Sequence, residues 1–172
     1  MNFSIVGIMR HLFPSQHELD CSWLLWRSLC RDLRTRGHSR SRESGAFLLA
    51  VQGSTDRRVV TYVLYDDLDP HCLDTGIVRF DGRYFSDLWV LCKARGLTVI
   101  ADIHVHPGDF GQSDSDRAHP MISRAGHIAL ILPDFAGRPQ WRWNIGMYRY
   151  EGGRRWSTVP HFNRWTWLKL GM

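Results

Sequence analysis

The sequence predicts a mixed α/β fold in which a mixed β-sheet is flanked by helices. Three observations predict it: an amphipathic helical pattern near the N-terminus, two apolar and β-branched runs separated by a short turn, and a second helical pattern that leads straight into an apolar strand. A chain of 172 residues is long enough to bury a sizeable core. We therefore expect residues 1–172 to form one domain.

The first predicted helix spans about Ser15 to Arg36 and should pack on the rest of the domain. Ser15 and Glu18 have the spacing of a capping box, in which two side chains satisfy the free N–H groups of a helix start. Gly37 is a typical residue at a helix end. Apolar side chains recur at helical spacing between these limits, at Leu19, Trp23, Trp26, Cys30 and Leu33.

Two strand-like runs follow, at residues 46–51 and 59–65. Residues 53–56 (Gly-Ser-Thr-Asp) lie between them and have the composition of a turn, so the two runs should pair as a hairpin. Residues 66–76 are expected to form a loop.

A second helix is predicted from Asp81 to Arg95, with Gly96 ending it. Residues 97–106 (LTVIADIHVH) then have the β-branched composition of a strand. The following polar stretch should contain at most a short helical turn, because Pro120 interrupts it. The remaining predicted strands are residues 127–132, 141–150 and, after a turn at Gly152–Gly153, 154–159.

The composition is that of an ordinary globular protein, with 44% hydrophobic and 23% charged residues. No stretch approaches the roughly 20 apolar residues that a membrane span needs. The N-terminal apolar run is short and lacks the positive region that begins a signal peptide. We therefore expect a cytoplasmic protein with no membrane partner. The cysteines are scattered without a C-x-x-C pair, which favours reduced, buried thiols: Cys21, Cys30, Cys72 and Cys92.

Arginine dominates a formal net charge of +5 and is concentrated in residues 31–42. Such a cluster could attract acidic partners or nucleic acid, but no aromatic-interleaved basic motif accompanies it, so a solvated helix end is the preferred interpretation. Five of the eight tryptophans follow residue 140. Core packing is expected for most of them, with a partner surface as the alternative.

One segment carries chemistry. His104 and His106 are two positions apart at the end of a predicted strand, so both imidazoles should point to the same side and could share one zinc ion. A carboxylate from the following loop would complete a three-ligand site with an open position for water. An H-x-H pair alone is a weak signal, and Ser113-x-x-Asp116 alone could be a simple helix cap. An amidohydrolase barrel, where H-x-H pairs also occur, would need a longer chain.

Taken together, His104-x-His106-Pro107 followed by Ser113-x-x-Asp116 resembles the JAMM motif of the JAB/MPN-plus metalloproteases. The resemblance extends upstream to Glu43, which precedes an apolar strand where that family places its catalytic glutamate. It implies a cytidine-deaminase-like JAB/MPN fold and one zinc ion per chain, held by His104, His106 and Asp116. It further implies that Glu43 is the general base and that Ser113 stabilises the oxyanion.

The sequence departs from the family at one point. The segment between His106 and Ser113 has six residues, one fewer than is usual. Asp109 and Asp114 are therefore alternative carboxylates, and Ser115 is an alternative hydroxyl. The internal S-x-x-D spacing favours Ser113 and Asp116.

The resemblance implies a zinc-dependent isopeptidase or peptidase that cleaves after the C-terminus of a ubiquitin-like protein. Stand-alone bacterial JAB proteins of this kind act beside E1-like and E2-like proteins, and antiphage conjugation systems are one such context. The main alternative is a RadC-like JAB protein with a DNA-linked role, although no helix-hairpin-helix pattern precedes the motif. A non-catalytic MPN scaffold is disfavoured because such scaffolds lack the ligands. Nucleic acid is not the expected partner.

Overall fold

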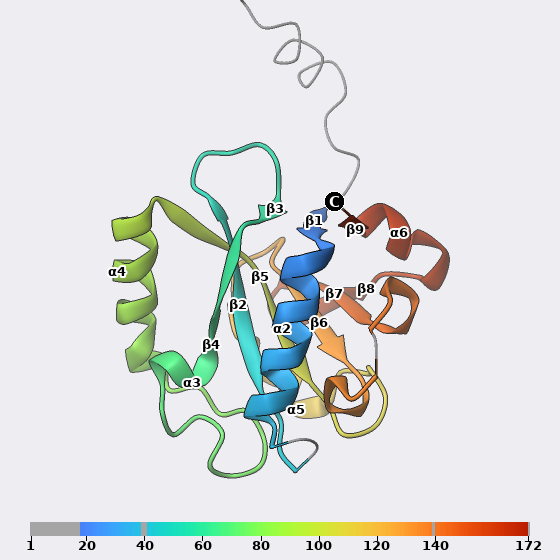
Figure 1. Ribbon diagram of the computed structural model, residues 1–172, viewed down its shortest axis with the longest axis horizontal. Helices are drawn as coiled ribbons and strands as arrows, with labels where there is room; N and C mark the ends of the chain where they lie inside the picture. The colour runs from blue at the N-terminus through green and yellow to red at the C-terminus, as the bar shows by residue number, and fades with distance from the viewer. Residues whose placement is uncertain (1–17, 39–40, 139, 172) are drawn as a thin grey trace, which may run out of the picture.

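The structure is a computed structural model that describes residues 18–38, 41–138 and 140–171. Its centre is a six-stranded mixed sheet with the strand order β4-β2-β5-β6-β7-β8 (Figure 1). β5 and β6 run parallel, and the other neighbours are antiparallel. The predicted mixed sheet is therefore confirmed. The strands are β2 (Gly45–Val51), β4 (Thr61–Leu64), β5 (Leu97–Val105), β6 (Ile128–Leu132), β7 (Gly146–Gly152) and β8 (Arg155–Thr158).

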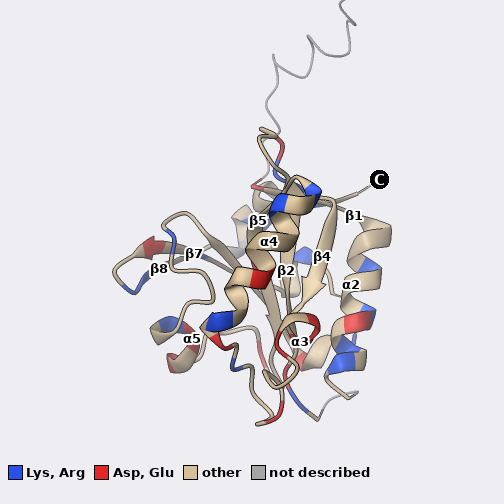
Figure 2. Ribbon diagram, turned by 90° about the vertical axis from the view of Figure 1, so that its left-hand side faces the viewer, with Lys and Arg blue, Asp and Glu red and all other residues tan. Residues whose placement is uncertain are grey.

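Helices cover both faces of this sheet, as predicted (Figure 2). Side chains alternate along β2, so Ala46, Leu48 and Ala50 pack with α2 (Trp23–Arg36), whereas Phe47 and Leu49 pack on the side of α4 (Phe85–Arg95). Gly96 ends α4 in the left-handed conformation, with φ of 62°. Two apolar cores therefore lie on either side of one sheet, and both depend on the register of β2.

The predicted first helix is wrong over its N-terminal part. Residues 19–22 form a strand, β1 (Leu19–Ser22), which lies between β3 (Arg58–Val59) and β9 (Leu168–Gly171) in a small parallel sheet. Pairing with residues so distant in sequence outweighs the local helical pattern. The helix begins instead after Ser22, whose side chain accepts a hydrogen bond from the Leu25 N–H at 3.3 Å. The predicted Ser15 cap lies outside the described residues, and Gly37 ends the helix as expected.

Three further predictions need correction. The run 59–65 is divided between β3 and β4, and the expected loop 66–76 begins inside a helical turn, α3 (Tyr65–Leu68). Of residues 141–150, only those from Gly146 onward join β7. The other short helical segments are η1 (Gly82–Tyr84), α5 (Asp114–Ala118), η2 (Asp134–Ala136), η3 (Arg142–Asn144), η4 (His161–Asn163) and α6 (Arg164–Trp167).

No helix among the described residues is long and apolar enough to cross a membrane.

Gly45 is the first residue of β2 and lies at the end of the sheet where the candidate site residues of β5 are found. Its Cα lies opposite His104 of β5, and the Tyr65 ring packs directly over it. A Cβ at this position would overlap the ring of Tyr65 and approach the Ile103 carbonyl oxygen to 2.8 Å. Tyr65 is fully buried and cannot move aside without disturbing the core.

Gly45→Ala should therefore lower the free energy of unfolding by about 1–3 kcal/mol, the usual cost of overpacking a close-packed core. Urea denaturation monitored by circular dichroism measures it. Gly82→Ala is the matched control, because nothing lies within 4 Å of a Cβ there. Equal stability of the two variants would contradict the account of the close approach.

Candidate metal centre

The candidate site lies where the parallel strands β5 and β6 end. His104 is the penultimate residue of β5, and His106 follows directly after it. The backbone N–H of His106 donates to the Leu132 carbonyl, at the end of β6, at 2.9 Å. The Phe135 N–H donates to the His106 carbonyl at 2.8 Å. These two hydrogen bonds hold the backbone of His106 against β6 although β5 itself ends at Val105, and they thereby fix the position from which the second imidazole projects.

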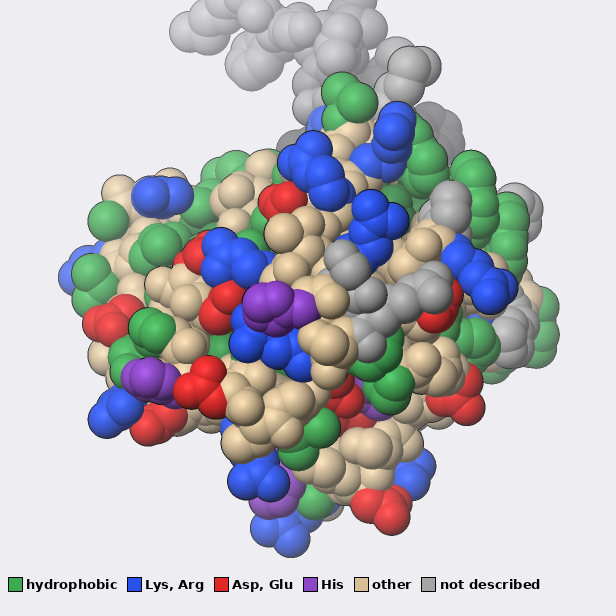
Figure 3. All heavy atoms as spheres, turned by 60° about the horizontal axis from the view of Figure 1, so that its bottom comes forward, with side chains coloured by type: hydrophobic (Ala, Val, Ile, Leu, Met, Phe, Trp, Pro, Cys, Tyr) green, Lys and Arg blue, Asp and Glu red, His purple; other side chains and the backbone are tan. Residues whose placement is uncertain are grey.

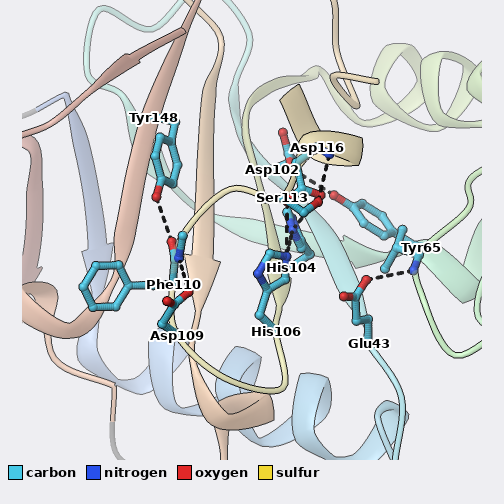
Figure 4. Close-up of polar contacts among 12 residues, drawn as sticks. Glu43, Tyr65, Asp102, His104, His106, Asp109, Phe110, Ser113, Asp116 and Tyr148 are labelled. Atoms are coloured by element: carbon cyan, nitrogen blue, oxygen red, sulfur yellow. Dashed lines mark hydrogen bonds and ion pairs between the residues drawn. The ribbon is translucent and has the colours of Figure 1, made fainter. Parts of the chain in front are cut away.

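The two imidazoles and Asp116 converge on one point (Figure 4). The Nε2 atoms of His104 and His106 are 3.0 Å apart. The carboxylate oxygens of Asp116 lie 3.4 Å from the His104 Nε2 and 3.3 Å from the His106 Nε2. Among the described residues these three form the group that could hold a metal ion.

These distances fit zinc. Tetrahedral zinc with ligand bonds of about 2.0–2.1 Å has neighbouring ligand atoms about 3.3 Å apart. The Nε2 atoms are 3.0 Å apart, and each lies 3.3–3.4 Å from a different oxygen of the Asp116 carboxylate, so the spacings are close to that value. Three protein ligands leave one corner for water, which is the arrangement of catalytic rather than structural zinc. The sequence-predicted ligands are therefore brought together in a geometry that a zinc ion can occupy.

The electrostatics of the group suit a cation. Burial raises the pKa of Asp116, but hydrogen bonds from both histidines outweigh burial, and the net pKa lies well below the usual range. Burial lowers the pKa of His104, but the hydrogen bond to Asp116 and that carboxylate's charge raise it overall. Asp116 therefore remains an anion, and positive charge is favoured beside it.

A capping box places Asp116. The Ser113 Oγ accepts a hydrogen bond from the Asp116 N–H at 3.1 Å, and the Asp116 Oδ2 accepts one from the Ser113 N–H at 2.7 Å. α5 extends for five residues only, in agreement with the short turn predicted before Pro120. The cap and the ligand role coexist, because the helix start orients the same carboxylate that faces the histidines.

The shortened segment between His106 and Ser113 is anchored midway. The Tyr148 hydroxyl donates to the Phe110 carbonyl at 2.8 Å, and the Gly111 N–H donates to the Asp109 side chain at 2.8 Å. The Asp109 carboxylate is therefore engaged within its own turn. Asp114 pairs with Arg117 at 2.8 Å and its side chain is fully exposed. Neither alternative carboxylate joins the histidine pair.

Glu43 comes to the site from β2. Because Gly45 lies opposite His104, the residues just before β2 run beside the end of β5. The Glu43 Oε2 accepts a hydrogen bond from the Val78 N–H at 3.0 Å, and the Glu43 N–H donates to the Gly76 carbonyl at 2.9 Å. Both bonds hold the residue at the edge of the site without occupying the metal ligands (Figure 4).

A narrow cleft of about 70 Å³ opens over these residues. Glu43, His104, Asp116 and Ser115 contribute to its walls, whereas Ser113 is not among the residues that line it. The surface at this end of the sheet carries interspersed acidic, basic and histidine side chains (Figure 3). Further walls are formed by Val78, Asp102, Gln112, His119, Pro120, Met121, Ala129 and Trp156.

A buried polar row beneath the cleft was not anticipated from the sequence. The Asp102 carboxylate lies 2.6 Å from the His127 Nε2 and accepts a hydrogen bond from the Tyr65 hydroxyl at 3.1 Å. Burial, followed by the charge of Asp102, raises the pKa of Tyr65 well above its usual value, so the phenol stays protonated and donates. The available signal was spacing: Asp102 precedes His104 by two positions and so shares its side of β5.

The cysteines take no part in the group. All four are free thiols, and burial raises the pKa of Cys21 and of Cys30 to about 12. They remain protonated at neutral pH and are poor metal ligands. This agrees with the expectation of reduced, buried thiols.

No family model matches the chain. Over 66 residues the sequence is 36% identical to a protein named probable metalloprotease y4jG from Sinorhizobium fredii. The match covers 38% of this chain and 41% of that relative, so it spans less than half of the relative's length. The chain is thus similar to a probable metalloprotease over part of its length, and its His-x-His pair and Asp116 converge as a group that could hold a metal ion.

The fold of the chain also occurs among solved structures. The solution structure of protein DSY2949 from Desulfitobacterium hafniense has a TM-score of 0.61, with 14% identity, over 88% of this chain and 92% of that one. At this identity the likeness concerns the fold alone. The crystal structure of AF2198, a JAB1/MPN domain protein from Archaeoglobus fulgidus, covers 88% of this chain and 96% of that one at 15% identity. Its TM-score of 0.46 is too low to support an argument.

We expect purified protein to bind about one equivalent of zinc per chain, as a three-ligand site should. His104→Ala and Asp116→Ala should each lose it, because two remaining ligands hold zinc weakly. Elemental analysis after gel filtration measures the content. His71→Ala is the control, since His71 is exposed and pairs only with Asp74 among the described residues. Full zinc content in both ligand variants would disprove the assignment.

Proposed function

We propose that this protein is a zinc-dependent isopeptidase or peptidase of the JAB/JAMM type that cleaves after the C-terminus of a ubiquitin-like protein. One observation carries the hydrolytic part of the proposal. Glu43, which is not a ligand, faces the same narrow cleft as His104 and Asp116. A general base beside an open metal position is the arrangement that activates water.

The ligand chemistry supports zinc as the ion. Two imidazoles and one carboxylate form a mixed nitrogen and oxygen set of the kind found in zinc hydrolases. When bound, zinc supplies Lewis-acid chemistry and lowers the pKa of a coordinated water toward about 7.

The residues of the chain then have distinct tasks. Glu43 accepts the proton of the attacking water and later delivers it to the leaving amine, so that water is added across the amide bond and carboxylic acid and amine are released. A serine hydroxyl at the start of α5 donates a hydrogen bond to the oxyanion. The walls at Trp156 and Met121 exclude bulk water from the cleft.

The substrate class rests on the family resemblance and on the width of the cleft. A volume of about 70 Å³ admits an extended, glycine-containing tail but no folded domain. Ubiquitin-like proteins end in such tails, and conjugation by E1-like and E2-like partners in a bacterial, antiphage setting is the context in which stand-alone JAB proteins act.

Incubation with a ubiquitin-like protein fused through its C-terminus to a reporter tests the proposal. The ubiquitin-like protein encoded nearest to this protein's gene is the preferred modifier for this fusion. Mass spectrometry should show cleavage after the last modifier residue, and a zinc chelator should abolish it. Chelator-resistant cleavage, or none with any ubiquitin-like fusion, would refute the proposed function.

Glu43→Gln should retain zinc and lose about 100-fold to 10,000-fold in kcat, the usual cost of removing a general base. Reporter release and zinc content are measured on the same preparation. Glu151→Gln is the control, because Glu151 is an exposed residue whose side chain accepts a hydrogen bond from Ser157. Turnover near that of the wild type would mean that another group is the base.

The two serines at α5 can be separated. The Ser113 Oγ is committed to the helix cap, whereas Ser115 lines the cleft. If Ser113 is the oxyanion donor, as the motif implies, Ser113→Ala should cost about 2.7–4 kcal/mol in the activation free energy. Measurement of kcat and zinc content for Ser113→Ala and Ser115→Ala decides between them. Loss of turnover in Ser115→Ala alone would assign the oxyanion hydrogen bond to Ser115 instead of Ser113.

A further inference from the structure

A second and larger hollow lies against α2, outside the candidate metal centre. It has a volume of about 400 Å³. The segment that follows η2 forms its other wall, and the Trp26 Nε1–H donates to the Gln140 carbonyl at 2.9 Å, which holds that wall on the helix. The walls include the rings of Trp23 and Trp141 and the buried Ala136. The lining of the hollow is mainly apolar.

Three tryptophans form a stacked ladder at one end of the hollow. The ring centroids of Trp23 and Trp141 are 5.0 Å apart with an interplanar angle of 20°, and those of Trp141 and Trp143 are 5.7 Å apart at 10°. Trp141 and Trp143 nevertheless remain 45% and 55% exposed. The sequence favours core packing for most of the late tryptophans, with a partner surface as the alternative, and these two are only partly packed.

Arginines surround the hollow. Arg27, Arg31 and Arg34 follow one another along α2, and Arg138 lies on the facing segment. Blue segments mark basic residues at several levels of α2 in Figure 2. Arg31 pairs with Asp32 at 3.2 Å, and Arg138 pairs with Asp134 at 3.3 Å. Within residues 18–38, 41–138 and 140–171, no ion pair is found for Arg27 or Arg34.

We propose that this hollow, bounded by the tryptophan ladder and the arginine row, binds an acidic protein segment that inserts bulky apolar side chains. The apolar walls match apolar anchors, and the cationic rim matches flanking carboxylates. Tryptophan and arginine are the residues most often found at such anchor points. An amphipathic acidic helix lying along α2 has the required distribution of both kinds of side chain.

Charge and stacking argue against other occupants. Single-stranded nucleic acid needs free ring faces for its bases, but the faces of Trp141 are already covered by Trp23 and Trp143. Residues 1–17 of this chain contain no aspartate or glutamate, so this segment does not have the carboxylates that would pair with the arginines of the rim. A second copy would bring a net charge of +5 to a basic surface.

The hollow adjoins a second one beside the segment that follows His106. Arg138 and Gln140 line both it and a neighbouring hollow, whose walls include Pro107 and Gly108 directly after His106. A long partner bound at the tryptophans would therefore reach the segment that follows His106. This orientation, unlike the binding itself, rests on the proposed peptidase function.

Selection from a random peptide library on the wild-type protein tests the proposal. Enriched peptides should combine acidic and bulky apolar residues, and fluorescence anisotropy then measures their affinity. The double variant Arg27→Glu/Arg34→Glu and the variant Trp141→Ala should each weaken binding about tenfold or more, as for the loss of anchor residues. Arg95→Glu is the matched control, because Arg95 is exposed in the last turn of α4 as Arg34 is in that of α2. It should bind as the wild type does.

The variant His104→Ala separates this inference from the proposed function. It should bind the same peptides with unchanged affinity although it lacks the metal, so failure of catalysis and failure of docking are distinguishable. No enrichment, enrichment of peptides without acidic residues, or equal binding by the three surface-substituted proteins would overturn the proposal. Binding of an oligo-dT strand that the double variant loses would assign the surface to nucleic acid, and a dimer that Trp141→Ala dissociates would assign it to a second copy.

Discussion

The antiparallel pairing of β2 with β5 is the constraint on which the site depends. Gly45 lies opposite His104, so the chain entering β2 and the chain leaving β5 meet at one end of the sheet. Because Gly45 has no Cβ, the Tyr65 ring can lie against the start of β2. From there the Tyr65 hydroxyl donates a hydrogen bond to the Asp102 carboxylate. A shift of the register by one residue would turn both the core side chains and the histidines to the wrong faces.

The loop after β5 also determines the geometry of the site, because it carries Asp116. Two of the three candidate ligands lie on or directly beside a rigid strand, but Asp116 belongs to a five-residue helix that could not hold its own position by helix propensity. The capping box with Ser113 and the Tyr148 hydrogen bond to Phe110 supply the missing rigidity. A ligand group built in this way is preorganised, because its members are fixed before any ion binds.

Local patterns and distant contacts contributed differently to what the sequence could predict. α4, β5 and the end of α2 followed from periodicity and from glycine stops, because their signals lie within the segments themselves. Residues 19–22 were predicted as helix, since their strand partners in β9 lie at the other end of the chain. The candidate ligand group was predicted from the spacing of the motif, whereas the buried contact of Asp102 with His127 depends on the pairing of β5 with β6.

We expect two imidazoles and one carboxylate, with no thiolate, to hold one zinc ion beside Glu43. X-ray absorption spectroscopy at the zinc edge of the loaded protein measures the ligand set. The expected spectrum has nitrogen and oxygen neighbours at about 2.0–2.1 Å, with the multiple-scattering pattern of two imidazoles. A sulfur shell at about 2.3 Å, or the pattern of a single imidazole, would contradict it.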